Sequence, residues 1–164
     1  MNIFLIKSVV VISLLLGIVS CKPENEYIYQ VNPISVKQDR GNKTNVKTTI
    51  EFITIAYTDL FSASISQAEL DKLSFCYQSV GDKKLIEDMI IKNFLKRSSV
   101  NIPTTATMRS DIPLFIKNTY IKLYNRIPDA TEQNLLVTKI EQNTTITAAI
   151  VYYAMMTSNE YRYY

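Results

Sequence analysis

The stretch 51-EFITIAYTDLF-61 decides the fold of this chain, because its apolar residues recur three or four positions apart. This spacing places them on one side of an α-helix, whereas a half-buried strand would alternate apolar and polar residues. The stripe consists of Phe52, Ile53, Ala56, Tyr57, Leu60 and Phe61. We therefore expect an amphipathic helix that begins near Thr48 and packs its apolar side against other elements.

A second stretch, 114-LFIKNTYIKLY-124, repeats the first one 63 positions later. Chance would give about one identity in a window of this size, and fixed-offset similarity is the mark of a repeat. Six residues are identical: Phe52/Phe115, Ile53/Ile116, Tyr57/Tyr120, Leu60/Leu123, Glu69/Glu132 and Leu73/Leu136. Any two amphipathic helices share Phe and Leu, but the shared Tyr and Glu favour duplication. The repeat predicts two similar three-helix units in tandem, residues 48–97 and 111–160.

The rest of each unit also has a helical pattern, so the predicted fold class is an all-α bundle of about six helices. Ser66 and Glu69 form a capping-box signal for a second helix, and Gly81 is expected to end it in the left-handed conformation. Asp82 is expected to cap a third helix. Its predicted inward residues are Leu85, Ile86, Met89, Ile90 and Phe94. The segment 98–113 is predicted to be a loop.

The last helical segment, 144-TTITAAIVYYAMMTS-158, is apolar nearly all round. Either it runs through the middle of the bundle or one of its sides is an interface. The C-terminal 160-EYRYY-164 adds three tyrosines, and exposed tyrosines are common in interfaces. Tyr161, Tyr163 and Tyr164 are therefore candidate partner-binding residues, although they could instead cover the end of the bundle.

The front of the chain has the pattern of a secreted protein. The segment 8-SVVVISLLLGIVS-20 is long enough for a signal peptide but shorter than the roughly 20 apolar residues of a spanning helix. A single-pass anchor with a short span is the alternative. Residues 1–20 are thus a predicted signal peptide, residues 21–47 a flexible tether, and residues 48–164 the helical domain.

Ile18-Val19-Ser20-Cys21 resembles the lipobox of bacterial lipoproteins. The resemblance implies a diacylglycerol on the Cys21 thiol, cleavage before Cys21, and acylation of the freed amine. Two or three acyl chains hold a protein on a membrane far more firmly than one. The residues after Cys21 include no aspartate and resemble the export signal of Bacteroidota lipoproteins. They imply anchoring in the outer membrane, with the periplasmic or cell-surface face left open.

The second half also resembles a helical domain family of unknown function in bacterial surface-exported proteins. The resemblance rests on 118-NTYIKLYNRIPDATEQ-133 and 154-AMMTSNEYRYY-164, and it implies a helical module outside the cytoplasm. The matching positions are Tyr120, Arg126, Pro128, Glu132, Ser158, Glu160 and Tyr161. These residues also have a structural explanation, in which Asp129 and Glu132 form a capping box and Arg126 pairs with Glu132 or Glu160.

Composition argues against several classes of function. The chain has no histidine, which removes Ser-His-Asp and Cys-His catalysis and histidine zinc sites. With Cys21 lipidated, Cys76 is the single remaining cysteine, and we expect it to be a buried structural thiol. Mixed charges with a net charge of +3 leave no basic stripe for nucleic acid. We expect no enzyme activity, no metal and no cofactor.

The sequence therefore predicts a lipid-anchored, non-enzymatic interaction or scaffolding module of a cell-envelope assembly, with another envelope protein as its partner. The alternative is a lipoprotein that binds a small ligand in a pocket between the two helical units. Tyrosines would line that pocket: Tyr57, Tyr120, Tyr152 and Tyr153.

Overall fold

A computed structural model describes residues 45–163 of the chain. The predicted signal peptide, Cys21, most of the predicted tether and Tyr164 lie outside these residues. The elements in chain order are α2 (Thr49–Phe61), α3 (Gln67–Ser79), α4 (Lys83–Leu95), α5 (Thr105–Ser110), α6 (Ile112–Tyr124), α7 (Ala130–Gln142), α8 (Ala148–Met156) and the 3-10 helix η2 (Glu160–Arg162). Within residues 45–163 there is no strand, only an isolated bridge between Val46 and Tyr163. The predicted all-α bundle is confirmed.

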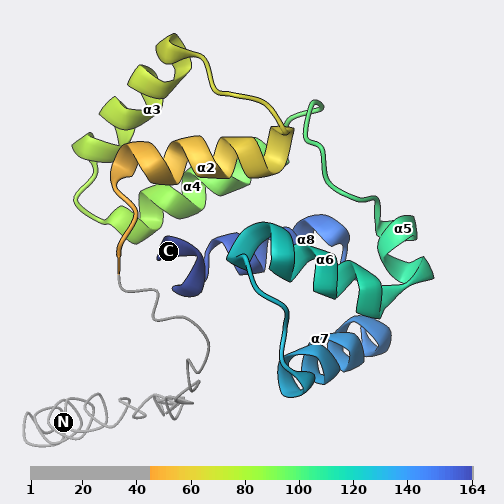
Figure 1. The fold of residues 1–164 in the computed structure, drawn as a ribbon. Helices are drawn as coiled ribbons and strands as arrows, with labels where there is room; N and C mark the ends of the chain where they lie inside the picture. The colour runs from red at the N-terminus through yellow and green to blue at the C-terminus, as the bar shows by residue number, and fades with distance from the viewer. Residues whose placement is uncertain (1–44, 164) are drawn as a thin grey trace, which may run out of the picture. The chain divides into compact units, whose positions relative to one another are not determined.

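The predicted repeat is visible in the bounds of the helices. Helix α6 begins and ends 63 positions after α2, and α7 begins and ends 63 positions after α3. Ser62 and Asn125, also 63 apart, end α2 and α6 in the same left-handed conformation, with φ of 53° and 54°. The third helices of the two units, α4 and α8, match less closely, because α4 has 13 residues and α8 has 9. We call α2–α4 the first unit and α6–α8 the second unit (Figure 1).

Local side-chain contacts explain where several helices begin. Thr48 and Glu51 form a complete capping box on α2, and the predicted box of Asp129 and Glu132 is present on α7. On α3 only half of the predicted capping box forms. The Ser66 hydroxyl accepts a hydrogen bond from the backbone amide of Glu69, but the Glu69 carboxylate binds Arg97 and not the amide of Ser66. The duplicated glutamate therefore keeps its position in the helix but not its capping contact.

The expectation for Gly81 is wrong. Gly81 is not in the left-handed conformation; α3 ends at Ser79, and the residue that follows, Val80, has an extended backbone. The Lys83 ammonium instead donates to the carbonyl oxygens of Tyr77 and Val80 at 2.7 and 2.9 Å. A cation satisfies these terminal carbonyls, so no backbone amide from a left-handed residue is needed.

The segment predicted to be a loop contains the six-residue helix α5, which Thr104 caps. Met108 of α5 is fully buried. Helix α5 packs against α6 and α8, and this packing stabilises a helix too short to be stable alone.

Helix α8 has one side buried among other helices, as the first of the two alternatives predicted, but Ile150 on its other side is 47% exposed, so the helix is not enclosed all round. It packs against α4, α5, α6 and η2, so it joins the two units. Its buried residues are Ala148, Val151, Tyr152, Met155 and Met156.

The predicted inward residues of α4 are partly wrong. Leu85 and Met89 are 50% and 54% exposed, whereas Ile86, Ile90 and Phe94 are buried as expected. Because α8 also packs against α4, the buried side extends to Ile91 and away from Leu85 and Met89.

The expectation of a buried Cys76 is also wrong, because this cysteine is exposed. Helix α3 packs against α2 and α4, and Tyr77 is its single buried residue. The preceding position, Cys76, therefore points away from that contact.

Candidate functional site

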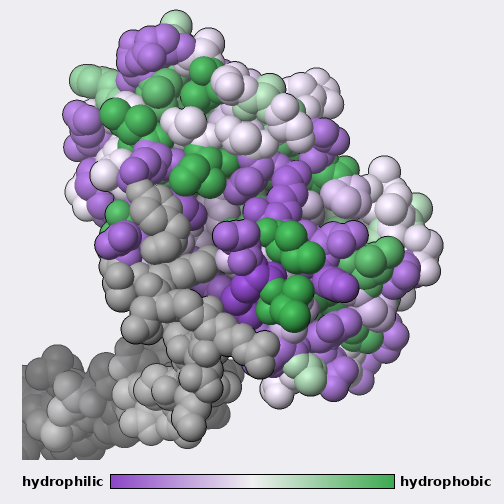
Figure 2. Space-filling view, in the orientation of Figure 1, coloured by the Kyte–Doolittle hydropathy of each residue, from purple (hydrophilic) through white to green (hydrophobic). Residues whose placement is uncertain are grey.

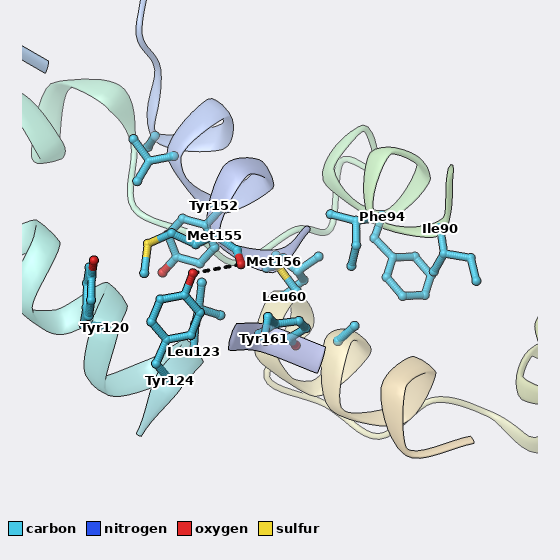
Figure 3. Close-up of a cluster of buried hydrophobic side chains, with 14 of the residues drawn as sticks. Leu60, Ile90, Phe94, Tyr120, Leu123, Tyr124, Tyr152, Met155, Met156 and Tyr161 are labelled. Carbon is cyan, nitrogen blue, oxygen red and sulfur yellow. Dashed lines mark hydrogen bonds between the residues drawn. The ribbon is translucent and has the colours of Figure 1, made fainter. Parts of the chain in front are cut away.

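Tyr161 in η2 is completely buried, so the expectation that its ring is free for a partner is wrong. Its hydroxyl donates to Asp59 Oδ2 at 2.7 Å, and its ring lies edge-on to Phe52, with 6.1 Å between centroids. The Lys47 ammonium lies 3.9 Å from the centre of the ring. In Figure 3 Tyr161 lies between Leu60 of α2 and the side chains of α6 and α8. Tyr161 covers the core, which was the second explanation of the C-terminal tyrosines.

Residues 158–163, which we call the strap, are fastened to both units by ion pairs. Arg162 Nε lies 2.9 Å from Glu87 of α4 in the first unit. Glu160 accepts from Arg126 at 2.6 Å in the second unit. Arg126 also binds Glu132 at 2.6 Å, so the predicted pairing of Arg126 forms with both glutamates.

The chain that enters the first helix is part of the same arrangement. The Lys47 amide donates to the Arg162 carbonyl at 2.9 Å, and Val46 pairs with Tyr163. Tyr163 is half-buried, and Tyr164 lies outside the described residues. The predicted tether therefore ends before Val46 rather than at Lys47.

Burial controls the protonation of the groups around the strap. Desolvation raises the pKa of the Asp59 carboxyl, and the Tyr161 hydroxyl and two nearby lysines oppose this rise. Desolvation and Asp59 raise the pKa of the Tyr161 hydroxyl well above its usual value. Burial and the neighbouring Glu87 raise the pKa of Tyr77 to about 12. These tyrosines stay neutral at physiological pH and serve as hydrogen-bond donors.

Each unit also has an arginine placed over a pair of aromatic rings. The Arg97 guanidinium lies 4.8 Å from the Phe94 ring centre and 5.7 Å from that of Phe61. In the second unit, Arg126 lies 5.0 Å from Tyr120 and 5.8 Å from Tyr124. The two arginines bind the duplicated glutamates, Glu69 and Glu132, although they come from different sequence positions. Arg97 does not stand out in the sequence as a site residue, because it has no arginine counterpart at the repeat offset.

The predicted tyrosine-lined pocket does not form, because its four tyrosines lie in separate places. Tyr57 packs against Phe61 and Phe94. Tyr120 packs against Tyr124, and the Tyr153 hydroxyl donates to Asp88. The fourth, Tyr152, borders a cleft beside α6.

That cleft is an open hollow of about 540 Å³ beside α6. One wall is the segment 101–103, which connects the units, and the other is formed by α5 and α6. Its floor includes Phe115 and Thr119, both buried, together with Tyr152 of α8. The sequence did not predict this cleft, since half of its lining comes from residues with no periodic pattern.

The most exposed large apolar side chain among residues 45–163 is Phe75 of α3, at 73%. The face shown in Figure 2 has only small apolar patches, separated by polar residues. The other exposed large apolar residues are each at most 56% exposed: Val46, Ile50, Leu85, Met89, Leu114, Ile121, Ile127, Leu135 and Ile150.

Within the described residues, no group of His, Cys, Asp and Glu is arranged to hold a metal ion. No helix of residues 45–163 is both long and apolar enough to cross a membrane. Comparisons with models of protein families, with curated proteins and with solved structures find no match for this chain. The two resemblances drawn from the sequence therefore stay predictions.

Proposed function

We propose that this protein is a lipid-anchored, non-enzymatic interaction or scaffolding module that contacts another envelope protein through the outer side of α3. The observation that carries the proposal is the 73% exposure of Phe75. A phenylalanine in water forgoes the free energy that burial of its ring would give, and aromatic residues are enriched at interfaces. Buried aromatic anchors of this kind supply much of the binding free energy in protein complexes.

The position of α3 supports this choice. It packs against α2 and α4 on one side, and most of its other side is exposed. The C-terminal tyrosines are less suitable, because Tyr161 is buried and Tyr163 pairs with Val46. The proposed contact surface therefore moves from the C-terminus, where the sequence predicted it, to α3.

The partner contact is tested with a photoreactive phenylalanine analogue at position 75 in cells. The matched control carries the analogue at Leu135, which is 55% exposed on α7, the counterpart of α3. We expect one defined crosslinked envelope protein from position 75 and none from position 135. We also expect Phe75→Asp to reduce co-purification of that protein more than about tenfold, with an unchanged melting temperature. Equal crosslinking from both positions, or none from position 75, would contradict the proposal.

The anchor is tested separately at Cys21, on the basis of the lipobox resemblance. We expect Cys21→Ser to leave an unprocessed precursor that takes up no labelled fatty acid, because the thiol that accepts the diacylglycerol is gone. The outer-membrane fraction should then lose the protein. Cys76→Ser is the matched control and should be processed and acylated normally. Fatty-acid labelling of the Cys21→Ser protein would show that the anchor is assigned to the wrong residue.

A further inference from the structure

The cleft beside α6 has a counterpart on α2, because the two helices are copies. At the offset of 63, Phe115 and Lys122 of the cleft correspond to Phe52 and Asp59 of α2. On α2 this pair holds Tyr161, whose ring contacts Phe52 and whose hydroxyl binds Asp59. The equivalent side of α6 is partly covered by Tyr152, whose ring centre is 6.2 Å from that of Phe115, and the remainder is open.

The charge at the end of this surface is reversed between the two copies. Asp59 accepts a hydrogen bond from a hydroxyl, whereas the Lys122 ammonium can only donate one. Within residues 45–163, Lys122 makes no hydrogen bond or ion pair; its ammonium lies 5.8 Å from the centre of the Tyr152 ring and close enough to Asp59 for an electrostatic interaction. The group that fits beside Lys122 is therefore an anion rather than a hydroxyl.

Most other polar groups in the cleft already have partners. Asp111 caps the Leu114 amide at 2.9 Å, and Ser110 donates to the Thr107 carbonyl at 2.7 Å. Thr119 donates to the Phe115 carbonyl at 2.8 Å. Asn118 and Lys122 lie one turn apart on α6, both are exposed, and neither side chain makes a hydrogen bond within residues 45–163.

The apolar part of the cleft consists of Ile102, Pro103, Leu114 and Phe115. Leu114 lies about 12 Å before Lys122 along α6, at ~1.5 Å per residue. A mostly apolar hollow with a few polar groups that fix orientation is the usual form of a small-molecule site. Asp111, at the start of α6, disfavours an anionic group at that end of the cleft, where no cation among the described residues lines it. At the other end Lys122 offsets the charge of Asp59, so a carboxylate is favoured there.

We propose that this cleft binds a small organic anion, with its apolar body against Leu114 and Phe115 and its carboxylate beside Asn118 and Lys122. This inference goes beyond the proposed function and does not depend on it, because α3 takes no part in the cleft. It also differs from the tyrosine pocket predicted from the sequence, since Tyr152 is the one residue common to both.

The test uses the full-length protein in lipid nanodiscs and calorimetric titration with 2-naphthoate, with empty nanodiscs as the blank. The uncharged 2-naphthamide has the same ring system and isolates the effect of the anion. We expect saturable binding of the carboxylate at one site, and at least about tenfold weaker binding of the amide, because the ion pair with Lys122 is lost.

Matched variants on α6 locate the site. Leu114→Asp and Lys122→Glu should each weaken naphthoate binding about tenfold or more. Ile121→Asp and Lys117→Glu make the same changes at exposed positions of α6 that do not line the cleft, and they should stay within about twofold of wild type. Thermal melts of all four variants establish that they are folded.

Three results would overturn the proposal. The first is no saturable binding of naphthoate up to about 1 mM. The second is equal loss of binding in the cleft variants and their controls, which would place the ligand elsewhere. The third is equal affinity for the acid and the amide, which would remove the role assigned to Lys122.

Discussion

Asp59 and Tyr161 form a hydrogen bond where burial disfavours the charged form of the carboxyl. The pKa of Asp59 is raised in the folded protein above its usual value, chiefly by desolvation. A carboxyl with a raised folded-state pKa contributes most stability at pH values below its unfolded pKa. That contribution is lost as the pH rises through the folded pKa. When Asp59 is ionised, its carboxylate accepts strongly from Tyr161, but the free-energy cost of burying the charge outweighs this gain.

We predict that Asp59→Asn leaves the free energy of unfolding at pH 7 equal to that of wild type or higher. The amide oxygen can still accept from Tyr161 without burying a charge. Asp59→Ala, in contrast, should cost about 1–3 kcal/mol, because it leaves a buried hydroxyl without an acceptor. Urea denaturation of the three proteins provides the measurement.

Repeating that measurement near pH 4 tests the sign of the effect. Wild type should gain stability relative to Asp59→Asn as the pH falls, since protonation of Asp59 is then favoured by folding. An Asn variant that is much less stable than wild type at pH 7 would show that the charge of Asp59 supports the fold.

At the scale of helices, the sequence was most informative where a feature occurs twice or is local. The repeat of apolar, Tyr and Glu positions predicted four helices in two equivalent pairs, and the structure places their ends at the same offset. The turn at Arg126 was also predictable, because Asp129 and Glu132 are close in sequence and their capping geometry is local.

What the sequence did not reveal depends on which elements become neighbours. Leu85 and Cys76 have apolar character and helical spacing, yet both are exposed, since the buried side of a helix is set by what packs against it. The same limit applies to the candidate sites. The cleft requires residues 101–103 to lie beside α6, and the burial of Tyr161 requires α2 to lie beside the strap.

At the scale of the whole helical region, the strap links parts of the chain that are far apart in sequence. Tyr161 binds Asp59 of α2, Arg162 binds Glu87 of α4, and Glu160 binds Arg126 after α6. These contacts add to the direct packing of α8 against α4. The two units are therefore held together by the last residues of the described chain.

We predict that truncation after Ser158 lowers the free energy of unfolding by more than about 3 kcal/mol, because it removes a fully buried tyrosine. It also leaves Glu87 without its arginine partner. Truncation after Arg162 is the matched control and should have a much smaller effect, since Tyr163 is half-buried and Tyr161 stays in place.

Chemical denaturation and hydrogen exchange of both truncated proteins measure these effects. Faster exchange in α2 and α4 is expected for the shorter protein, because its strap contacts with both helices are gone. Equal stability of the two truncated proteins would mean that the strap does not hold the units together.

The pairing of Val46 and Lys47 with Tyr163 and Arg162 has a mechanical consequence. A pulling force that arrives along the chain ahead of Asn45 meets this short antiparallel pair before it reaches the first turn of α2. The hydrogen bond between the Lys47 amide and the Arg162 carbonyl and the contact of the Lys47 ammonium with the Tyr161 carbonyl are therefore among the first under load. Tension on the chain therefore acts on the strap, whose contacts hold the two units together. These contacts can break while the helices themselves stay intact.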